Sequence, residues 1–246
     1  RYITGEDMNA TQQDASYINC ETDYIVGLET GSGNPSPVTA YGVLKGIQAA
    51  LNEIYGSADL TGRTIAIQGL GAVGRRLAER LHDAGAKLYV TTRDQAKIDR
   101  AVVDLGAIPV GLDEIYGVEC DVFSPCARGA IINDKTIDKF KCKIIAGAAN
   151  NQLAEPKHGD MLEEKGILYV PDYVINSGGV INIIDDISGR PYNRENALKN
   201  TAKIYDACKK VFEIAKRDGI PTYKAADIMA EERIAAVGKI QKIYNK

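Results

Sequence analysis

The hexapeptide Gly69-Leu70-Gly71-Ala72-Val73-Gly74 has the residue types and spacing of a turn that can hold a diphosphate. It follows the apolar run 64–68 and opens a helical pattern that continues to Ala84. A strand, a G-x-G-x-x-G turn and a helix in this order form a dinucleotide-binding fingerprint. The N–H groups and the positive dipole end of such a helix hold the pyrophosphate. The alternative is an ordinary glycine-rich turn of an α/β protein.

Each glycine of this turn has a separate expected task. Gly69 allows the tight turn, Gly71 lets the backbone approach the pyrophosphate, and Gly74 lets the helix pack on the strand. Ala72 and Val73 belong to the first turn of the helix and complete the expected cofactor contact. Arg75 and Arg76 follow directly and could add positive potential.

The residues after the second strand indicate which dinucleotide fits. In NAD-specific domains, an Asp or Glu about 20 residues after the glycines binds the ribose 2′-OH. Here that position falls on Thr92, followed by Arg93. A hydroxyl and a guanidinium suit a 2′-phosphate, which a carboxylate would repel. The alternative is that Arg93 is solvated and Asp94 supplies the carboxylate. We therefore expect NAD or NADP, with a slight preference for NADP.

The elements that must position these residues alternate along the middle of the chain. Helical patterns cover 72–84 and 95–105. Apolar strand-like runs occupy 64–68, 87–91, 109–110, 121–124, 143–148 and 168–170. This alternation predicts an α/β fold, a Rossmann-like doubly wound parallel sheet with helices on both faces.

Helical patterns also lie on both sides of this region. Pro37 begins a long helix that ends near Gly56. After Val174 the pattern becomes helical, with no strand between the last helices, over 180–187, 194–217 and 225–244. These residues predict a C-terminal helical closing segment.

Composition excludes several classes of partner. The chain has 246 residues, with 30 basic and 33 acidic side chains. No basic stripe suits nucleic acid, and no apolar run is long enough to span a membrane. The five cysteines are irregularly spaced, which fits reduced thiols in the cytoplasm better than disulfides or a metal site. We expect a small-molecule ligand and no metal.

Five segments occur in an order that is specific to one family. They are residues 34–42 (Asn-Pro-Ser-Pro-Val-Thr-Ala-Tyr-Gly), the glycine turn, 121–127 (Asp-Val-Phe-Ser-Pro-Cys-Ala), 146–153 (Ala-Gly-Ala-Ala-Asn-Asn-Gln-Leu) and 171–182 (Pro-Asp-Tyr-Val-Ile-Asn-Ser-Gly-Gly-Val-Ile-Asn). Together they resemble the Glu/Leu/Phe/Val dehydrogenase family, most closely its leucine and phenylalanine dehydrogenase branch. The resemblance runs from Arg1 to about Arg233. It implies reversible oxidative deamination of an L-amino acid to a 2-oxo acid and ammonia.

The resemblance also implies roles for individual residues. Asp7 matches the carboxylate that shuttles a proton at the substrate amine. Thr39 matches the residue that binds the nicotinamide carboxamide. Ala148, Asn150 and Asn151 match positions near the nicotinamide, and Asn151 also lies near the substrate amine. Each residue also has an alternative role without the resemblance. Asp7 would be a solvated or helix-capping acid, and Thr39 would be an ordinary residue in the first turn of a helix. Asn150 and Asn151 would form a strand-end turn.

Three small or apolar residues match the family's side-chain pocket: Gly5, Val180 and Ile183. Such a pocket accepts a hydrophobic side chain and leaves a carboxylate side chain unpaired. We expect a substrate of the leucine, valine or phenylalanine type. Gly5 and Ile183 look more like the phenylalanine branch, whereas Val180 fits either branch. The alternative for Val180 and Ile183 is plain helix core.

The sequence also departs from the family pattern. The family's N-terminal domain carries a Gly-rich motif with the catalytic Lys and a second Lys for the substrate carboxylate, and no Gly-Gly-Gly-Lys segment occurs here. We expect the C-terminal part of an enzyme that is a homo-oligomer at full length: residues 1–30 as a remnant of the catalytic domain, 31–190 as the Rossmann domain and 191–246 as C-terminal helices. This part alone should bind a dinucleotide but catalyse poorly.

Two other functions compete with this one. The first is an inactive, stand-alone NAD(P)-binding module, which the absent lysines favour and the presence of Asp7 and Thr39 disfavours. The second is a hydroxy-acid dehydrogenase, which would need a catalytic His with a carboxylate partner. Neither His82, in the helix after the glycines, nor His158, in a polar loop, suits that role.

Overall fold

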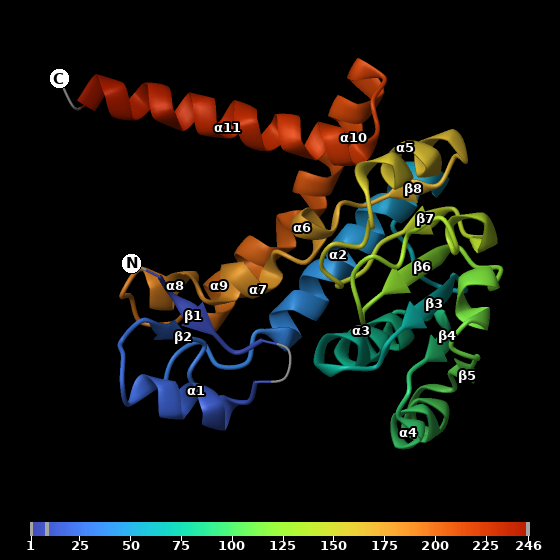
Figure 1. The fold of residues 1–246 in the computed structure, drawn as a ribbon, viewed down its shortest axis with the longest axis horizontal. Coiled ribbons are helices and arrows are strands. Elements are labelled where there is room, and N and C mark those ends of the chain that lie inside the picture. The colour runs from blue at the N-terminus through green and yellow to red at the C-terminus, as the bar shows by residue number, and fades with distance from the viewer. Residues whose placement is uncertain (1, 8–9, 245–246) are drawn as a thin grey trace.

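The structure, a computed structural model, describes residues 2–7 and 10–244 (Figure 1). Residue 1, where the resemblance begins, and residues 245–246, at the end of the predicted range 191–246, lie outside the described residues, as do residues 8–9. Within the described part, no helix combines the length and apolar composition that a membrane crossing requires.

Six parallel strands form the main sheet in the order β5-β4-β3-β6-β7-β8. Numbered from the first strand of this sheet, the order is 3-2-1-4-5-6, which is the doubly wound order of a Rossmann fold. The predicted fold class is therefore confirmed. The strands are β3 (Thr64–Gln68), β4 (Lys87–Thr91), β5 (Ile108–Pro109), β6 (Val122–Pro125), β7 (Ile144–Ile145) and β8 (Leu168–Tyr169).

Both faces of this sheet are covered. The helices between its strands are α3 (Ala72–Asp83), α4 (Gln95–Leu105) and α5 (Pro156–Glu164), with two 3-10 turns, η1 (Glu114–Gly117) and η2 (Ile137–Lys139). The sequence patterns predicted α3 and α4 but not α5, and the polar loop predicted around His158 is in fact part of this helix. That helix begins at a proline and is mostly polar, so it has little apolar periodicity, and His158 and Glu155 cap its start.

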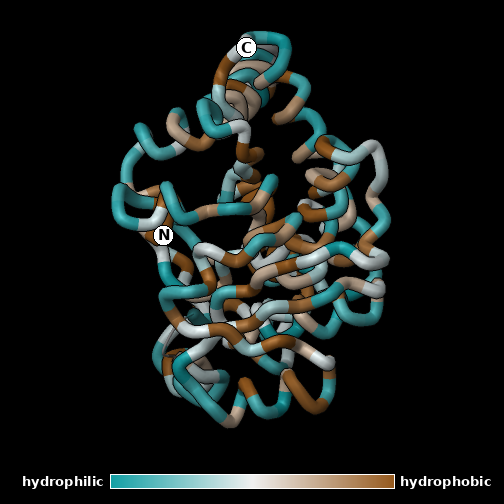
Figure 2. The backbone as a smooth tube through the Cα atoms, turned by 90° about the vertical axis from the view of Figure 1, so that its right-hand side faces the viewer, coloured by the Kyte–Doolittle hydropathy of each residue, from teal (hydrophilic) through white to brown (hydrophobic). Residues whose placement is uncertain are grey.

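Successive side chains of a strand point alternately into two hydrophobic clusters, one on each face of the sheet, as a sheet buried on both faces requires. In β3, Ile65 and Ile67 face one cluster while Ala66 faces the other. The second cluster contains Phe123 and Phe140, whose ring centroids lie 5.1 Å apart. Figure 2 shows many hydrophobic residues in the strands that cross the middle of the molecule.

The long helix α2 (Ser36–Tyr55) joins the sheet to the C-terminal helices. It packs against α3 and α10, and Gly56 ends it with a left-handed φ of 71°. Gly46 permits close approach of the chain after β8, because an added Cβ would lie 2.3 Å from Ile175 Cγ1.

The C-terminal part is helical, as predicted. Its helices are α6 (Asp172–Ile175), α7 (Gly178–Asn182), α8 (Ile184–Ile187), α9 (Arg194–Ala202), α10 (Ile204–Asp218) and α11 (Thr222–Tyr244). Two predicted helical stretches are each divided in two, near residues 183 and 203. α11 extends away from the rest of the molecule in Figure 1.

The N-terminal segment forms a small unit that the sequence reading missed. Strands β1 (Thr4–Gly5) and β2 (Ile25–Val26) pair in parallel and are joined through α1 (Gln12–Asn19). A capping box between Thr11 and Asp14 begins α1. Figure 1 places this unit beside α8 and near the start of α2.

Candidate dinucleotide and substrate site

The fingerprint glycines occupy three different environments. Gly69 has a φ of 100°, and its N–H donates to the carbonyl oxygen of Thr91 at 2.8 Å. At Gly74, an added Cβ would lie 2.0 Å from the carbonyl oxygen of Gly69, so only glycine fits between helix and turn. At Gly71, an added Cβ would meet no described atom within 4 Å. The middle glycine thus faces the open space that a diphosphate would need.

The start of α3 suits an anion. Gly71 is the N-cap and has no side chain, so no capping side chain occupies the N–H groups at the start of the helix, those of Ala72 and Val73 included. The first turn reads Ala-Val-Gly-Arg, without an acidic residue that would repel a phosphate. The partial positive charge of the helix end adds to this attraction. These residues fit the pyrophosphate of a dinucleotide.

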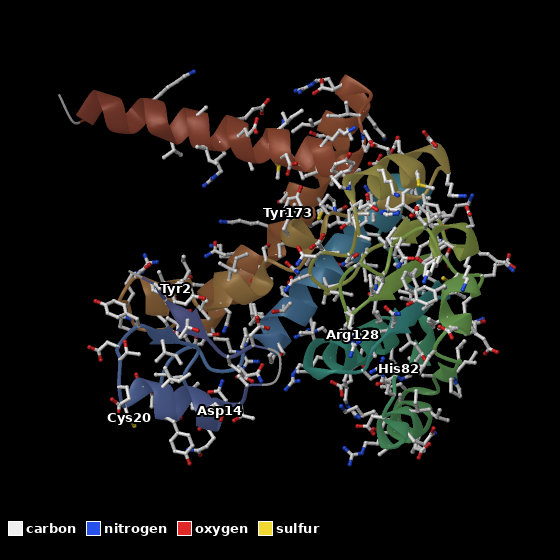
Figure 3. The ribbon with its side chains drawn as sticks, viewed as in Figure 1. Tyr2, Asp14, Cys20, His82, Arg128 and Tyr173 are labelled. Atoms are coloured by element: carbon white, nitrogen blue, oxygen red, sulfur yellow. The ribbon has the colours of Figure 1, made fainter. Side chains whose placement is uncertain are left out.

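The strand order reverses between β3 and β6, and ligands of open α/β sheets bind at this point. Ala127, just after β6, lies directly against the turn, because an added Cβ on Gly69 would be 2.8 Å from Ala127 Cβ. Arg128 follows, is exposed and pairs with no acidic group among the described residues. Figure 3 shows it next to α3. Arg128 was not among the predicted site residues, although a cation just after the fourth strand is visible in the sequence.

Arg75 does not face this space as a free charge. It donates to Glu79 at 2.8 Å and to Asp104 at 3.0 Å, which neutralise it. Arg76 donates to the carbonyl oxygen of Ala72 at 2.8 Å. The charge of Arg75 is therefore paired with acids of α3 and α4 and adds little positive potential at the glycine turn.

The end of β4 carries the predicted 2′-position. Thr92 is half-buried and Arg93 is exposed, without an ion pair in the described part of the chain. Asp94 is the N-cap of α4: its carboxylate accepts from the backbone N–H of Lys97 at 3.4 Å and pairs with the Lys97 ammonium at 3.4 Å. Its carboxylate is thus engaged in capping. A groove of about 570 Å³ lies beside Thr92, between α4 and the segment after β5.

Thr39 lies where α7 meets the first turn of α2. Its hydroxyl donates to the carbonyl oxygen of Pro35 at 3.0 Å, which agrees with the plain role of a first-turn threonine. Gly178 and Gly179 allow α7 to touch it, since a Cβ on Gly179 would lie 2.9 Å from Thr39 Oγ1. Thr39 is therefore held at a fixed point between two helices.

The loop after β7 holds Asn150 and Asn151 at the carboxyl edge of the sheet. Asn151 has a left-handed φ of 52°, and its N–H donates to Asp172 Oδ2 at 2.7 Å. Asn176 donates to the carbonyl oxygen of Ala148 at 3.2 Å and to Asn150 Oδ1 at 2.5 Å. Both asparagines are exposed, so the strand-end turn that they form leaves them accessible from outside.

Two buried polar side chains, Gln152 and Asp172, hold the loop after β7 in place. Gln152 is fully buried, and its amide donates to the carbonyl oxygens of Gly147 and Ala149, each at 2.9 Å. Asp172 also accepts a hydrogen bond from the Tyr169 hydroxyl at 2.6 Å. Burial, and then the negative charge of Asp172, raise the pKa of Tyr169 well above its usual value, so Tyr169 remains a donor at neutral pH.

Two of the three residues predicted for the side-chain pocket, Gly5 and Ile183, lie near β2. Gly5 pairs with Val26, and an added Cβ on Gly27 would lie 4.0 Å from Ile183 Cγ2. Val180 is 61% exposed on α7, which contradicts the plain-core alternative for that residue. The exposed Asp7 follows β1, and it does not cap α1, because Thr11 does so.

The polar side chains around His158 bind one another at the start of α5. His158 Nδ1 accepts from the N–H of Glu155 at 3.1 Å, and Nε2 lies 3.1 Å from Asp134 Oδ1. Lys157 pairs with Asp134 at 3.1 Å and with Glu155 at 3.2 Å. This arrangement caps α5 and gives His158 no role in the site described above.

Comparisons with known proteins agree with this geometry. A sequence profile described as glutamate/leucine/phenylalanine/valine dehydrogenase matches residues 31–98 and 90–241. The chain belongs to this family. It is 56% identical to leucine dehydrogenase of Thermoactinomyces intermedius, over 99% of this chain and 67% of that enzyme. It is 44% identical to phenylalanine dehydrogenase of Bacillus thermotolerans, over 99% of this chain and 65% of that enzyme.

A solved structure of this family has the same fold. L-Tryptophan dehydrogenase from Nostoc punctiforme aligns with a TM-score of 0.86 and 43% identity, covering 97% of this chain and 69% of that one. The chain thus spans about two thirds of the length of the relatives it matches. As a member of a dehydrogenase family with a Rossmann fold, it is suited to a nicotinamide dinucleotide.

Proposed function

We propose that this chain supplies the dinucleotide site and part of the substrate site for NAD(P)-dependent oxidative deamination of a hydrophobic L-amino acid. The main support is the fingerprint turn, in which Gly71 alone of the three glycines faces open space at the start of α3. Bound there, the dinucleotide would supply the acceptor for the hydride that leaves the substrate Cα.

The chain's own residues have distinct proposed roles. Thr39 holds the carboxamide of the nicotinamide, and Asn150 and Asn151 orient the ring and the substrate amine. Asp7 takes the proton that the amine releases and later returns one to the departing ammonia. The fixed positions of Thr39 and of the 150–151 loop support these roles, because orientation contributes strongly to such reactions.

The substrate side chain would lie against Gly5, Val180 and Ile183. These residues offer only hydrogen and aliphatic carbon, so a carboxylate side chain would find no polar partner there. Side chains of the leucine, valine or phenylalanine type are therefore preferred over glutamate. Glycine at position 5 adds no side chain of its own to the pocket, which supports the phenylalanine type.

For the cofactor we propose NAD or NADP, with a slight preference for NADP. Arg93 is exposed and unpaired within the described residues, while Asp94 is engaged at the start of α4. Titration of NADH and NADPH by fluorescence tests this preference. Arg93→Ala should weaken NADPH binding about tenfold and NADH binding little. Clearly tighter binding of NADH by the wild type would contradict it.

The decisive test of the reaction is its ammonium dependence. The full native protein should oxidise NADH or NADPH only when both a branched or aromatic 2-oxo acid and ammonium are present. For the 246-residue polypeptide alone we propose dinucleotide binding with slow turnover, since no Gly-Gly-Gly-Lys segment occurs in it. Dinucleotide binding with no ammonium-dependent oxidation by the full protein would favour the second candidate, an NAD(P)-binding module.

Two further features of the working protein are proposals. All five cysteines are free, which supports a reducing, cytoplasmic environment. A homo-oligomer of the full-length protein is the state that the family resemblance supports.

A further inference from the structure

Residues 27–34 form a loop between β2 and α2, and one carboxylate on α8 fastens it. Asp186 Oδ2 accepts hydrogen bonds from the N–H of Gly27 at 3.0 Å, from the N–H of Ser32 at 3.3 Å and from the Ser32 hydroxyl. Gly31 lies against the same carboxylate, since an added Cβ would be 2.8 Å from Asp186 Oδ1. Hydrogen bonds to a charged acceptor are stronger than those between neutral groups.

A second side chain, at the end of α7, also holds the loop. Asn182 is 1% exposed; its amide donates to the carbonyl oxygen of Ser32 at 3.2 Å, and its Oδ1 accepts from the Tyr192 hydroxyl at 2.8 Å. Within the loop, the N–H groups of Gly31 and Gly33 both donate to the carbonyl oxygen of Leu28 at 2.9 Å. Gln12 of α1 also donates to the carbonyl oxygen of Gly27 at 2.9 Å. The loop is therefore a compact unit, and Asp186 and Asn182 attach it to the α7–α8 region.

This loop connects two parts of the proposed site. At its start, Val26 pairs with Gly5, and a Cβ added to Gly27 would point toward Ile183, 4.0 Å from its Cγ2. At its end, α2 begins and carries Thr39 in its first turn. Ile183 lies between Asn182 and Asp186 in the sequence. The groups that fasten the loop thus flank a residue of the pocket.

We infer that Asp186 is a positioning residue for the substrate side-chain pocket. Its carboxylate fixes the distance between the wall formed by β1 and β2, which contains Gly5, and the wall formed by Ile183. In this role it acts through its hydrogen bonds to Gly27 and Ser32. Loss of the carboxylate would let the loop move and widen the pocket. This inference rests on the proposed amino-acid dehydrogenase function.

The test uses the full native enzyme with Asp186→Ala, Asp186→Asn and the control Asp185→Asn. Asp185 is the neighbouring acid, which pairs with Arg190 at 3.3 Å and accepts from the N–H of Asn193 at 3.3 Å. Steady-state kinetics with 2-oxo acids of the valine, leucine and phenylalanine type give KM, kcat and their ratios. NADH affinity is measured separately by fluorescence and shows whether each variant keeps its dinucleotide domain.

For Asp186→Ala we expect KM for the 2-oxo acid to rise about tenfold, and the preference among side-chain sizes to flatten, with NADH affinity within twofold of wild type. Asp186→Asn keeps one acceptor oxygen and should lie between wild type and Asp186→Ala. Hydrogen exchange should show faster exchange at Gly27 and Ser32 in Asp186→Ala than in Asp185→Asn.

Other outcomes separate the inference from the function on which it rests. Unchanged KM and size preference in Asp186→Ala, with an active wild type, would overturn the inference and leave the function standing. A parallel loss of NADH affinity would also overturn it, because it would show general damage. A wild-type enzyme without ammonium-dependent activity would refute the proposed function, and with it any role of Asp186 in the reaction.

Discussion

At Gly71 and Gly74 the addition of one methyl group has opposite structural consequences. The Cβ at position 74 would lie 2.0 Å from the carbonyl oxygen of Gly69, whereas the Cβ at position 71 would have space around it. The φ of Gly71 is −72°, which alanine adopts without strain. One position is therefore restricted by the protein itself, and the other by what it is expected to bind.

We predict that Gly71→Ala folds normally and binds NADH at least tenfold more weakly, because the methyl group takes space needed by the pyrophosphate. Gly74→Ala should instead lose about 1–3 kcal/mol of stability from overpacking. Urea unfolding and NADH fluorescence measure the two effects. Wild-type NADH affinity in Gly71→Ala would show that the dinucleotide does not bind at this turn.

The buried cysteines allow a second prediction at this scale. Burial raises the pKa of the Cys120, Cys142 and Cys208 thiols to about 12, so at pH 8 they are almost entirely protonated and unreactive. Cys20 is exposed. Ellman's reagent at pH 8 should titrate Cys20 rapidly in the folded chain and the three buried thiols only after unfolding.

A matched variant, Cys20→Ser, should remove this rapid phase. Because the thiolate fraction of a group with a pKa near 12 stays very small up to about pH 9, raising the pH from 7 to 9 should leave the three buried thiols unlabelled. Rapid modification of three or more thiols in the folded state would contradict the packing around β6, β7 and α10.

The residue scale also shows what the sequence could and could not predict. The glycine turn was predictable because its constraints act within six consecutive residues. Asp186 was not, because its partner Gly27 is 159 residues away. Arg128 shows a different limit: its place next to the glycine turn depends on β6 pairing with β3, which sequence patterns indicate only indirectly.

At the element scale, apolar runs predicted the central strands well. β3 and β4 have the predicted bounds, because both faces of each strand are buried and the run is continuous. β1 and β2 are two residues each, and their pairing depends on residues about twenty positions apart. The polar helices α1 and α5 were missed, because their starts depend on capping groups rather than on an apolar face.

A carboxylate at the start of β6 ties two central strands together. Asp121 accepts from the N–H of Thr64 at 2.8 Å and from its hydroxyl at 2.9 Å, and pairs with Arg63 at 3.2 Å. Burial alone would raise the pKa of Asp121, but the hydrogen bonds from Thr64 and Tyr55 and the charge of Arg63 outweigh it, and the pKa is lowered. The carboxylate form is therefore favoured by the folded state.

We predict that Asp121→Asn lowers the free energy of unfolding at pH 7 by about 1–3 kcal/mol. Since the folded pKa lies below the unfolded value of about 3.9, this contribution is full above pH 5 and is lost as the pH falls through the folded pKa. The difference between wild type and variant should therefore shrink below pH 4. Urea unfolding from pH 7 to pH 3 measures it.

Asp113→Asn is the matched control, because Asp113 is exposed and its side chain makes no capping hydrogen bond to η1. It should change stability by less than about 0.5 kcal/mol at every pH. A pH-independent difference between wild type and Asp121→Asn would show that packing, and not the ionised carboxylate, ties β3 to β6.

At the scale of the whole molecule, α2 connects parts that the sequence separates. One hydrophobic cluster contains Ile47 of α2, Leu77 of α3 and Phe212 of α10. It therefore extends across the predicted boundary at residue 190. The division into 1–30, 31–190 and 191–246 stays a prediction. Because this cluster joins α2, α3 and α10, we expect these three helices to unfold together.

The last helix, α11, has two halves with different surroundings. In its first half, Ala225 and Ala226 are buried, and Tyr173 of α6 donates to Asp227 at 2.7 Å (Figure 3). In its second half, Ile234 is 71% exposed and Val237 46% exposed. A helix without packing in water has little stability of its own. The second half thus adds little to the stability of this chain.

We predict that truncation after Ala230 shifts the Tm of the 246-residue chain by less than about 2 °C, because it removes less than about 1 kcal/mol of tertiary packing. Ala226→Glu should lower the Tm by about 5 °C or more, because it places a charge in the core beside α10. Thermal unfolding followed by circular dichroism measures both. A larger decrease in Tm on truncation than on Ala226→Glu would contradict this prediction. It would mean that the second half of α11, with Ile234 and Val237, packs against the rest of the chain.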